Sequence, residues 1–204
     1  MEIALFGVAF VLWAGLTLFF WRAGAWLPYY VAGSAGAAVL LVVVAREFLP
    51  LELALRASTA RGVDFLASLV GIHTSVTWSD PGAIVVVGVP HHQEWTHLNV
   101  GLESSGLLEI AALAGLIAFF PRGGALDRSK ILAVALLATF AANIVRVLVI
   151  VAFVAHFGQG TLDFVHTFLG RALFFVMAIG IYWYAITRPT IRTVGARLRG
   201  GAFG

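Results

Sequence analysis

Long apolar runs with few or no charged residues set the strongest limit on how this chain can fold. A helix needs roughly 20 apolar residues to cross the hydrocarbon core of a bilayer. Only 11% of the residues are charged and 61% are hydrophobic, whereas globular proteins carry about 25% charged residues. This composition excludes a soluble enzyme and a disordered chain. It predicts an all-α integral membrane protein with about six transmembrane helices, at residues 3–21, 26–45, 62–78, 102–120, 131–156 and 162–186.

The distribution of Lys and Arg predicts the topology, because these residues gather in cytoplasmic connections. The third span is short and contains Asp64 and His73. With only five spans, however, the cations of 46–61 would share one connection with the basic-free stretch 79–99. With six spans and both termini in the cytoplasm, Arg22 is the only cation in an external connection. The other cations that lie between or after the spans are then cytoplasmic: Arg46, Arg56, Arg61, Arg122, Arg128, Lys130, Arg188, Arg192, Arg197 and Arg199.

These features predict one transmembrane domain at 1–187 in the cell membrane, followed by a basic cytoplasmic tail at 188–204. The bilayer then accounts for the net charge of +3, so we expect no nucleic-acid partner. The external loop contains a strand-like, β-branched segment at 83–89 and ends in the polar cluster 91–97. Cysteine is absent, which excludes disulfides and thiolate metal sites.

Ionisable residues inside membrane spans are costly and usually functional. The fourth span begins with Glu103-Ser104-Ser105, the fifth carries Asn143 and Arg146, and the sixth carries His166 and Arg171. The predicted topology brings Ser104, Arg146 and His166 toward the outer half of the bilayer. Asn143 lies three residues before Arg146 and therefore shares its helix face.

These side chains fit acyl transfer on a peptide bond. A serine hydroxyl needs a base, and imidazole titrates near neutrality. Arginine is always charged and presents five donors, so Arg146 suits the negative charge that develops on the carbonyl oxygen. Asn143 would hold or supplement Arg146. Glu103 or Glu109 would be the structural partner of Arg146, and Arg171 would reach either the site or a neighbouring carboxylate.

Other functions are compatible with the same residues. A non-catalytic scaffold would use Arg146 and the carboxylates as an ion-pair lock, and the small residues 33–38 for helix packing. The external His91, His92, Glu94 and His97 invite a zinc site. The His-Glu-x-x-His signature of metalloproteases fails, however, because Gln93 precedes Glu94. We therefore predict neither a metal nor another cofactor.

The order of these motifs resembles the exosortase/archaeosortase family of membrane transpeptidases. That family carries Cys-Ser-Gly or Cys-Thr-Gly at the outer end of one span, an Asn-x-x-Arg element on the next span and a histidine on the one after. Here the motifs read Ser104-Ser105-Gly106, Asn143-Ile144-Val145-Arg146 and His166. The resemblance covers about 83–187.

The resemblance implies a substrate and a role for each site residue. The substrate would be an exported protein with a C-terminal sorting signal, made of a short motif, a transmembrane helix and a basic end. The enzyme would cleave it at the external face, then transfer or release it. Ser104 stands where the family has its nucleophilic cysteine, with Arg146 as the essential arginine and His166 as the histidine. Either serine is the natural nucleophile, or it replaces a single cysteine.

A rhomboid-like intramembrane serine protease is the alternative enzyme. Rhomboids carry Gly-x-Ser-Gly on their fourth span and a histidine on their sixth. Ser105 would then be the nucleophile, with Glu103 where a glycine is expected. This reading leaves Arg146 unexplained.

Overall fold

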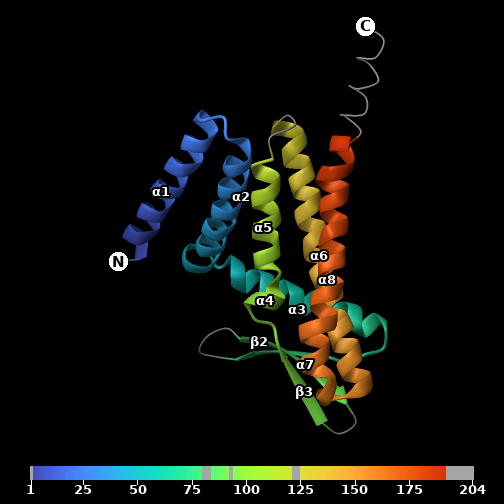
Figure 1. Ribbon diagram of the computed structural model, residues 1–204. Helices are drawn as coiled ribbons and strands as arrows, with labels where there is room; N and C mark the ends of the chain where they lie inside the picture. The colour runs from blue at the N-terminus through green and yellow to red at the C-terminus, as the bar shows by residue number, and fades with distance from the viewer. Residues whose placement is uncertain (1, 80–83, 92–93, 121–124, 192–204) are drawn as a thin grey trace, which may run out of the picture.

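A computed structural model describes residues 2–79, 84–91, 94–120 and 125–191 of the chain. It is a helical bundle with a small sheet at one end (Figure 1). The N-terminal helices are α1 (Glu2–Arg22), α2 (Trp26–Val43) with its π-helical extension η1 (Val44–Phe48), and α3 (Leu51–Leu69). The sheet contains β1 (Ser75–Ser79), β2 (Ile84–His91) and β3 (Glu94–Asn99). The C-terminal helices are α4 (Leu102–Ser105), α5 (Leu107–Ala118) and α6 (Ala125–Phe157), followed by a last helix built from η2 (Gln159–Thr161), α7 (Leu162–Phe164), η3 (Val165–Leu169), α8 (Gly170–Tyr182) and η4 (Trp183–Thr187).

The predicted class, an all-α integral membrane protein, is confirmed. Within the described residues, four helical stretches are long and apolar enough to cross a membrane: Ala4–Arg22, Trp26–Phe48, Arg128–Phe157 and Gln159–Ile191. The apolar helix α5 is shorter than these, because Gly106 separates it from α4. Most residues of α1 are exposed in the isolated chain, and nearly all residues of α2 are exposed or half-buried, as expected of surfaces that face lipid.

The predicted third span at 62–78 is wrong. Helix α3 ends at Leu69, a turn with Gly71 at φ +77° follows, and the chain enters β1 at Ser75. Figure 1 shows α3 lying across the bundle axis, below the ends of α2 and α5 and against the side of α6. Its charged residues explain this orientation, since Arg56 pairs with Glu52 on the same helix and further charges follow at 61 and 64.

The altered path of α3 also corrects the predicted topology. The chain passes along the bundle five times, through α1, α2, α5, α6 and the last helix, so α1 starts and the last helix finishes at opposite ends (Figure 1). The predicted topology placed Arg46 and Arg56 on the same side of the membrane as Arg188. In the structure, η1 and the start of α3 lie at the opposite end of the bundle from the end of η4 (Figure 1), and both cations pair with Glu52. The sequence prediction of cytoplasmic termini at both ends is therefore not compatible with this fold.

The sheet packs against α6 at one end of the bundle, below α4 in Figure 1. Its strands are antiparallel in the order β1-β2-β3, and β2 and β3 are joined in the register Val87↔Leu98. Inward-facing residues alternate with exposed ones along β3, as a half-buried strand requires. The shared core of the sheet, α3, α6 and η3 comprises Ala60, Val63, Val87, Val89, Leu98, Val100, Val147, Ile150, Val151, Val154 and Val165.

Helices α2 and α5 approach so closely that a glycine is required between them. A Cβ on Gly115 would lie 2.3 Å from the backbone oxygen of Ser34. Gly115→Ala should therefore lower stability by about 1–3 kcal/mol, as other overpacked cores do, although alanine ordinarily favours helices. Thermal unfolding in detergent checks this. Gly180→Ala on α8, where nothing lies within 4 Å, is the control. Equal melting temperatures for the two variants would contradict the close approach.

Candidate active site

The Ser-Ser-Gly motif forms a break between two helices. Gly106 adopts φ +78°, a left-handed conformation that glycine tolerates best, and it separates α4 from α5. A Cβ at this position would also meet the Asn143 side chain at 3.2 Å. Because α4 is only four residues long, its carbonyl groups lack the partners that a longer helix would provide.

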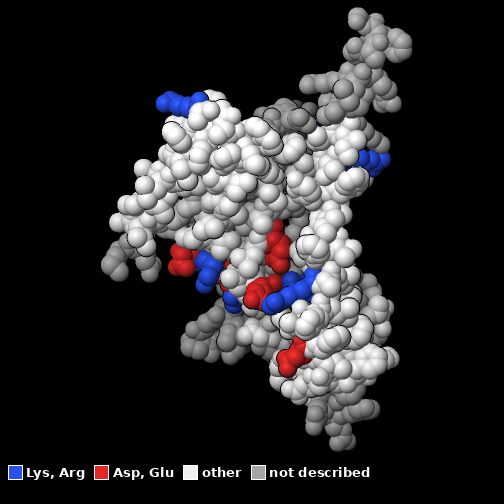
Figure 2. Space-filling model, in the orientation of Figure 1, with Lys and Arg blue, Asp and Glu red and all other residues white. Residues whose placement is uncertain are grey.

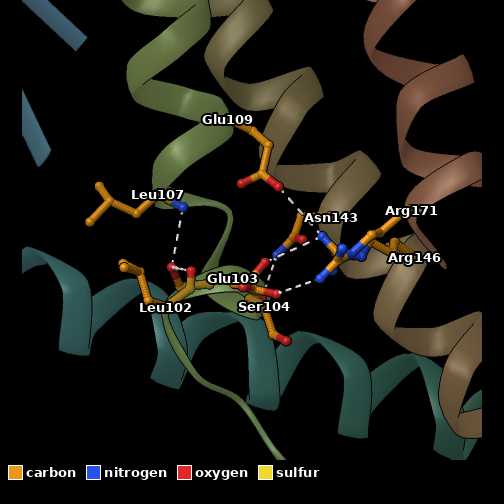
Figure 3. Close-up of polar contacts among 9 residues, drawn as sticks. Leu102, Glu103, Ser104, Leu107, Glu109, Asn143, Arg146 and Arg171 are labelled. Atoms are coloured by element: carbon orange, nitrogen blue, oxygen red, sulfur yellow. Dashed lines mark hydrogen bonds and ion pairs between the residues drawn. The ribbon is translucent and has the colours of Figure 1, made fainter. Parts of the chain in front are cut away.

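Two polar side chains of α6 supply those partners. Asn143 donates from Nδ2 to the backbone oxygen of Ser104 at 2.8 Å, and Arg146 donates from a terminal guanidinium nitrogen to the backbone oxygen of Glu103 at 3.3 Å. Figure 3 shows both contacts converging on α4. Asn143 is completely buried and Arg146 is 3% exposed. The two side chains therefore fix the backbone on which Ser104 lies.

The structure distinguishes the two serines of the motif. The Ser105 hydroxyl donates to the backbone oxygen of Leu102 at 2.7 Å and accepts from the N–H of Leu107 at 3.1 Å. It thereby satisfies the first free N–H of α5. The Ser104 side chain is also buried, but within the described residues its hydroxyl makes no hydrogen bond. Of the two hydroxyls, that of Ser104 is the one not committed to holding the backbone.

The charged residues form two ion pairs beside the motif. Arg146 lies 3.4 Å from an oxygen of Glu109, and Arg171 lies 3.2 Å from an oxygen of Glu103 (Figure 3). The Arg146 side chain is 4% exposed and Arg171 is 58% exposed. The guanidinium of Arg146 also lies over the ring of Phe174, 5.8 Å from its centroid. Of the two carboxylates named as partners in the sequence analysis, that of Glu109 pairs with Arg146. The carboxylate of Glu103 pairs with Arg171 instead, and Glu103 contacts Arg146 only through its backbone oxygen.

His166 lies on η3, a single π-helical turn within the last helix. Such turns are rare and often occur at functional sites. The imidazole is half-buried and lies within electrostatic range of Arg146, Glu103, Arg171 and Asp163. Among the described residues there is no hydrogen bond between His166 and Ser104. Catalytic hydrogen bonds are often long without substrate and tighten when the substrate binds.

A cavity of about 410 Å³ lies next to the two ion pairs, between α5, α6 and α8. Ser104, Asn143 and His166 are not among the residues that line it. In Figure 2 it appears as a hollow in which acidic and basic side chains meet. The sequence singled out its charged residues but not its apolar ones, because apolar residues facing a cavity look like any others in a membrane span. The lining consists of Glu103, Leu108, Glu109, Arg146, Arg171, Phe174, Phe175 and Ala178.

The external histidine cluster is described only in part. The side chain of His97 lies on the exposed face of β3. The side chains of His91, His92 and Glu94 lie outside the described residues, so the structure gives no arrangement for a metal there.

Comparison with known proteins agrees with the arrangement of these motifs. The family model of transmembrane exosortases matches residues 2–184, which is most of the chain. No curated protein matches the chain, and no solved structure matches it. The match includes the first two helices, for which the sequence motifs gave no indication. The resemblance drawn from the Ser104, Arg146 and His166 motifs is confirmed, and the chain belongs to the transmembrane exosortase family.

Proposed function

We propose that this membrane transpeptidase cleaves the C-terminal sorting signal of exported, membrane-tethered proteins at the external face of the cell membrane. Ser104 is the nucleophile, His166 the base, and Arg146 the donor to the developing oxyanion. The observation that carries this assignment is the way α6 holds α4: Asn143 and Arg146 bind the carbonyl groups on either side of the Ser104 α-carbon, next to a cavity. This support fixes a buried residue whose hydroxyl makes no hydrogen bond among the residues that the structure describes.

The distribution of cations supports an external site. At the bundle end remote from the sheet lie Arg22, Arg128, Lys130 and Arg188, at the ends of α1, α6 and η4. At the sheet end, both Arg46 and Arg56 are paired with Glu52. The positive-inside rule assigns the remote end to the cytoplasm. The sheet, the Ser104 motif and the start of α1 then face outside.

The proposed chemistry is acyl transfer in two steps. The Ser104 oxygen attacks the substrate carbonyl carbon while its proton passes to His166. Collapse of the tetrahedral intermediate breaks the C–N bond, and His166 returns the proton to the leaving amine. An amine acceptor or water then attacks the resulting ester, giving a new amide or a free carboxylate and regenerating the serine. Arg146 stabilises the negative carbonyl oxygen in both steps.

Replacement of His166 tests the proposed function. His166→Ala should slow cleavage of a tagged exported protein that ends in a motif, a transmembrane helix and a basic tail by about 100-fold or more, the usual contribution of a general base. Immunoblotting for the shortened product measures it. His156→Ala, at the exposed end of α6, is the matched control. Unchanged processing by inserted His166→Ala protein would overturn the assignment of His166 as base.

A further inference from the structure

The helices α5 and α8 enclose a wedge that is closed at one end and open at the other. Toward the cytoplasmic end of the proposed topology, Leu113 and Ile117 of α5 share a small core with Ile186 of η4. Nearer to Ser104, the cavity separates Leu108 of α5 from Phe175 of α8. Figure 2 shows the hollow opening sideways between these two helices. An opening in this direction faces the lipid rather than the water.

Two residues that line the wedge carry a buried polar atom without a hydrogen-bond partner among the described residues. These atoms are the second carboxylate oxygen of Glu109 and the Nε of Arg146. Arg146 is more than nine-tenths buried. A buried polar atom without a hydrogen bond is costly, and these two atoms are an acceptor and a donor. The site therefore lacks a ligand that brings both N–H donors and a carbonyl acceptor.

The first turn of a transmembrane helix is such a ligand. Its first four N–H groups have no partner within the helix, and in a membrane each must be satisfied. These groups carry partial positive charge, which a carboxylate stabilises. A peptide segment just before the helix also provides a carbonyl oxygen for the Nε of Arg146. A cavity of about 410 Å³ accommodates a short segment of this kind but not a complete helix.

We infer that the wedge between α5 and α8 is a lateral entrance that binds the N-terminal end of the substrate's transmembrane helix, with Glu109 accepting hydrogen bonds from its first N–H groups. This inference rests on the proposed function. The direction of the chain fits it, because α5 and α8 both run from the site end toward the opposite end. A substrate helix with its N-terminus outside runs parallel to them, and the peptide bond preceding it lies next to Ser104.

Filling the wedge tests the inference. Ala178 lines the cavity, whereas Ala172 lies exposed on the same helix and does not line it. Ala178→Trp should lower processing of the tagged motif–helix–basic-tail protein at least tenfold, and Ala172→Trp should leave it unchanged. Equal processing by both variants would overturn the lateral entrance while leaving the proposed function intact. Absence of processing by the unmodified protein would instead reject the proposed function.

Crosslinking provides a measurement that does not depend on turnover. Because the chain lacks cysteine, Leu108→Cys and Phe175→Cys can each be labelled with benzophenone maleimide. After illumination, mass spectrometry should locate crosslinks in the first two turns of the tagged protein's helix. The control is Leu137→Cys, a 71% exposed position on α6 away from the cavity. Crosslinks that are equally frequent from Leu137→Cys, or that spread along the whole helix, would contradict binding in the wedge.

Discussion

Ser104→Ala is expected to reduce processing of the tagged substrate at least about 1000-fold, because loss of the nucleophile removes the covalent pathway. The protein should still insert and fold. The Ser104 hydroxyl makes no hydrogen bond within the described residues, so its removal leaves no buried group unpaired. Processing rates from pulse–chase labelling, together with melting temperatures in detergent, measure the two effects separately.

Two further variants make this result specific to position 104. Ser105→Ala removes the hydrogen bonds that its hydroxyl makes with Leu102 and Leu107 and should cost about 1 kcal/mol of stability, while processing continues. Ser104→Cys should retain processing and make it sensitive to iodoacetamide, since the chain has no other cysteine. Loss of processing in Ser105→Ala with normal processing in Ser104→Ala would favour the rhomboid-like alternative.

Arg146→Ala is expected to produce the second large effect. Processing should decrease about 100- to 1000-fold, as when an oxyanion donor is removed. Stability should decrease by about 3 kcal/mol, because Glu109 loses its partner and the backbone oxygen of Glu103 loses its donor. Arg146→Lys should recover part of the stability but little processing, because a lysine cannot reproduce the several fixed N–H groups of arginine.

A double variant separates the structural and catalytic effects of Arg146. In Arg146→Met with Glu109→Gln, no unpaired carboxylate remains beside the cavity, so the melting temperature should rise above that of Arg146→Ala. Processing should remain as low as in the single variant. Recovery of processing together with stability would show that Arg146 is only an ion-pair lock, as the scaffold alternative requires.

The sequence was sufficient for the membrane class, the family and the grouping of the charged residues. Membrane class follows from hydropathy alone, and an arginine as buried as Arg146 demands a carboxylate partner. The sequence could not predict the partners of Arg171 and Ser105. Arg171 could reach either the site or a neighbouring carboxylate, and the hydrogen bond of Ser105 to the start of α5 depends on the helix break that Gly106 produces.

The sequence misassigned residues 62–78 for a physical reason. Counting cations by segment ignores ion pairs, and Arg46 and Arg56 both pair with Glu52 at the sheet end of the bundle. Within the loop predicted to be external, the segment at 83–89 overlaps β2 (Ile84–His91), but the pairing strands β1 and β3 were not predicted. In β1 and β3 the alternation of apolar and polar residues is short, and both strands contain several polar residues. The predicted limits of the domain, 1–187, remain a prediction; the helix continues to Ile191, and 192–204 lie outside the described residues.

The central claim is that the hydroxyl on α4 becomes covalently bound to substrate, and mass spectrometry of an acid-quenched reaction tests it most directly. Purified protein is mixed in detergent with the tagged motif–helix–basic-tail protein, quenched and digested. We predict an ester-linked substrate fragment on Ser104, labile to hydroxylamine and absent from Ser104→Ala. Turnover without any adduct at position 104, or an adduct on Ser105, would contradict the account.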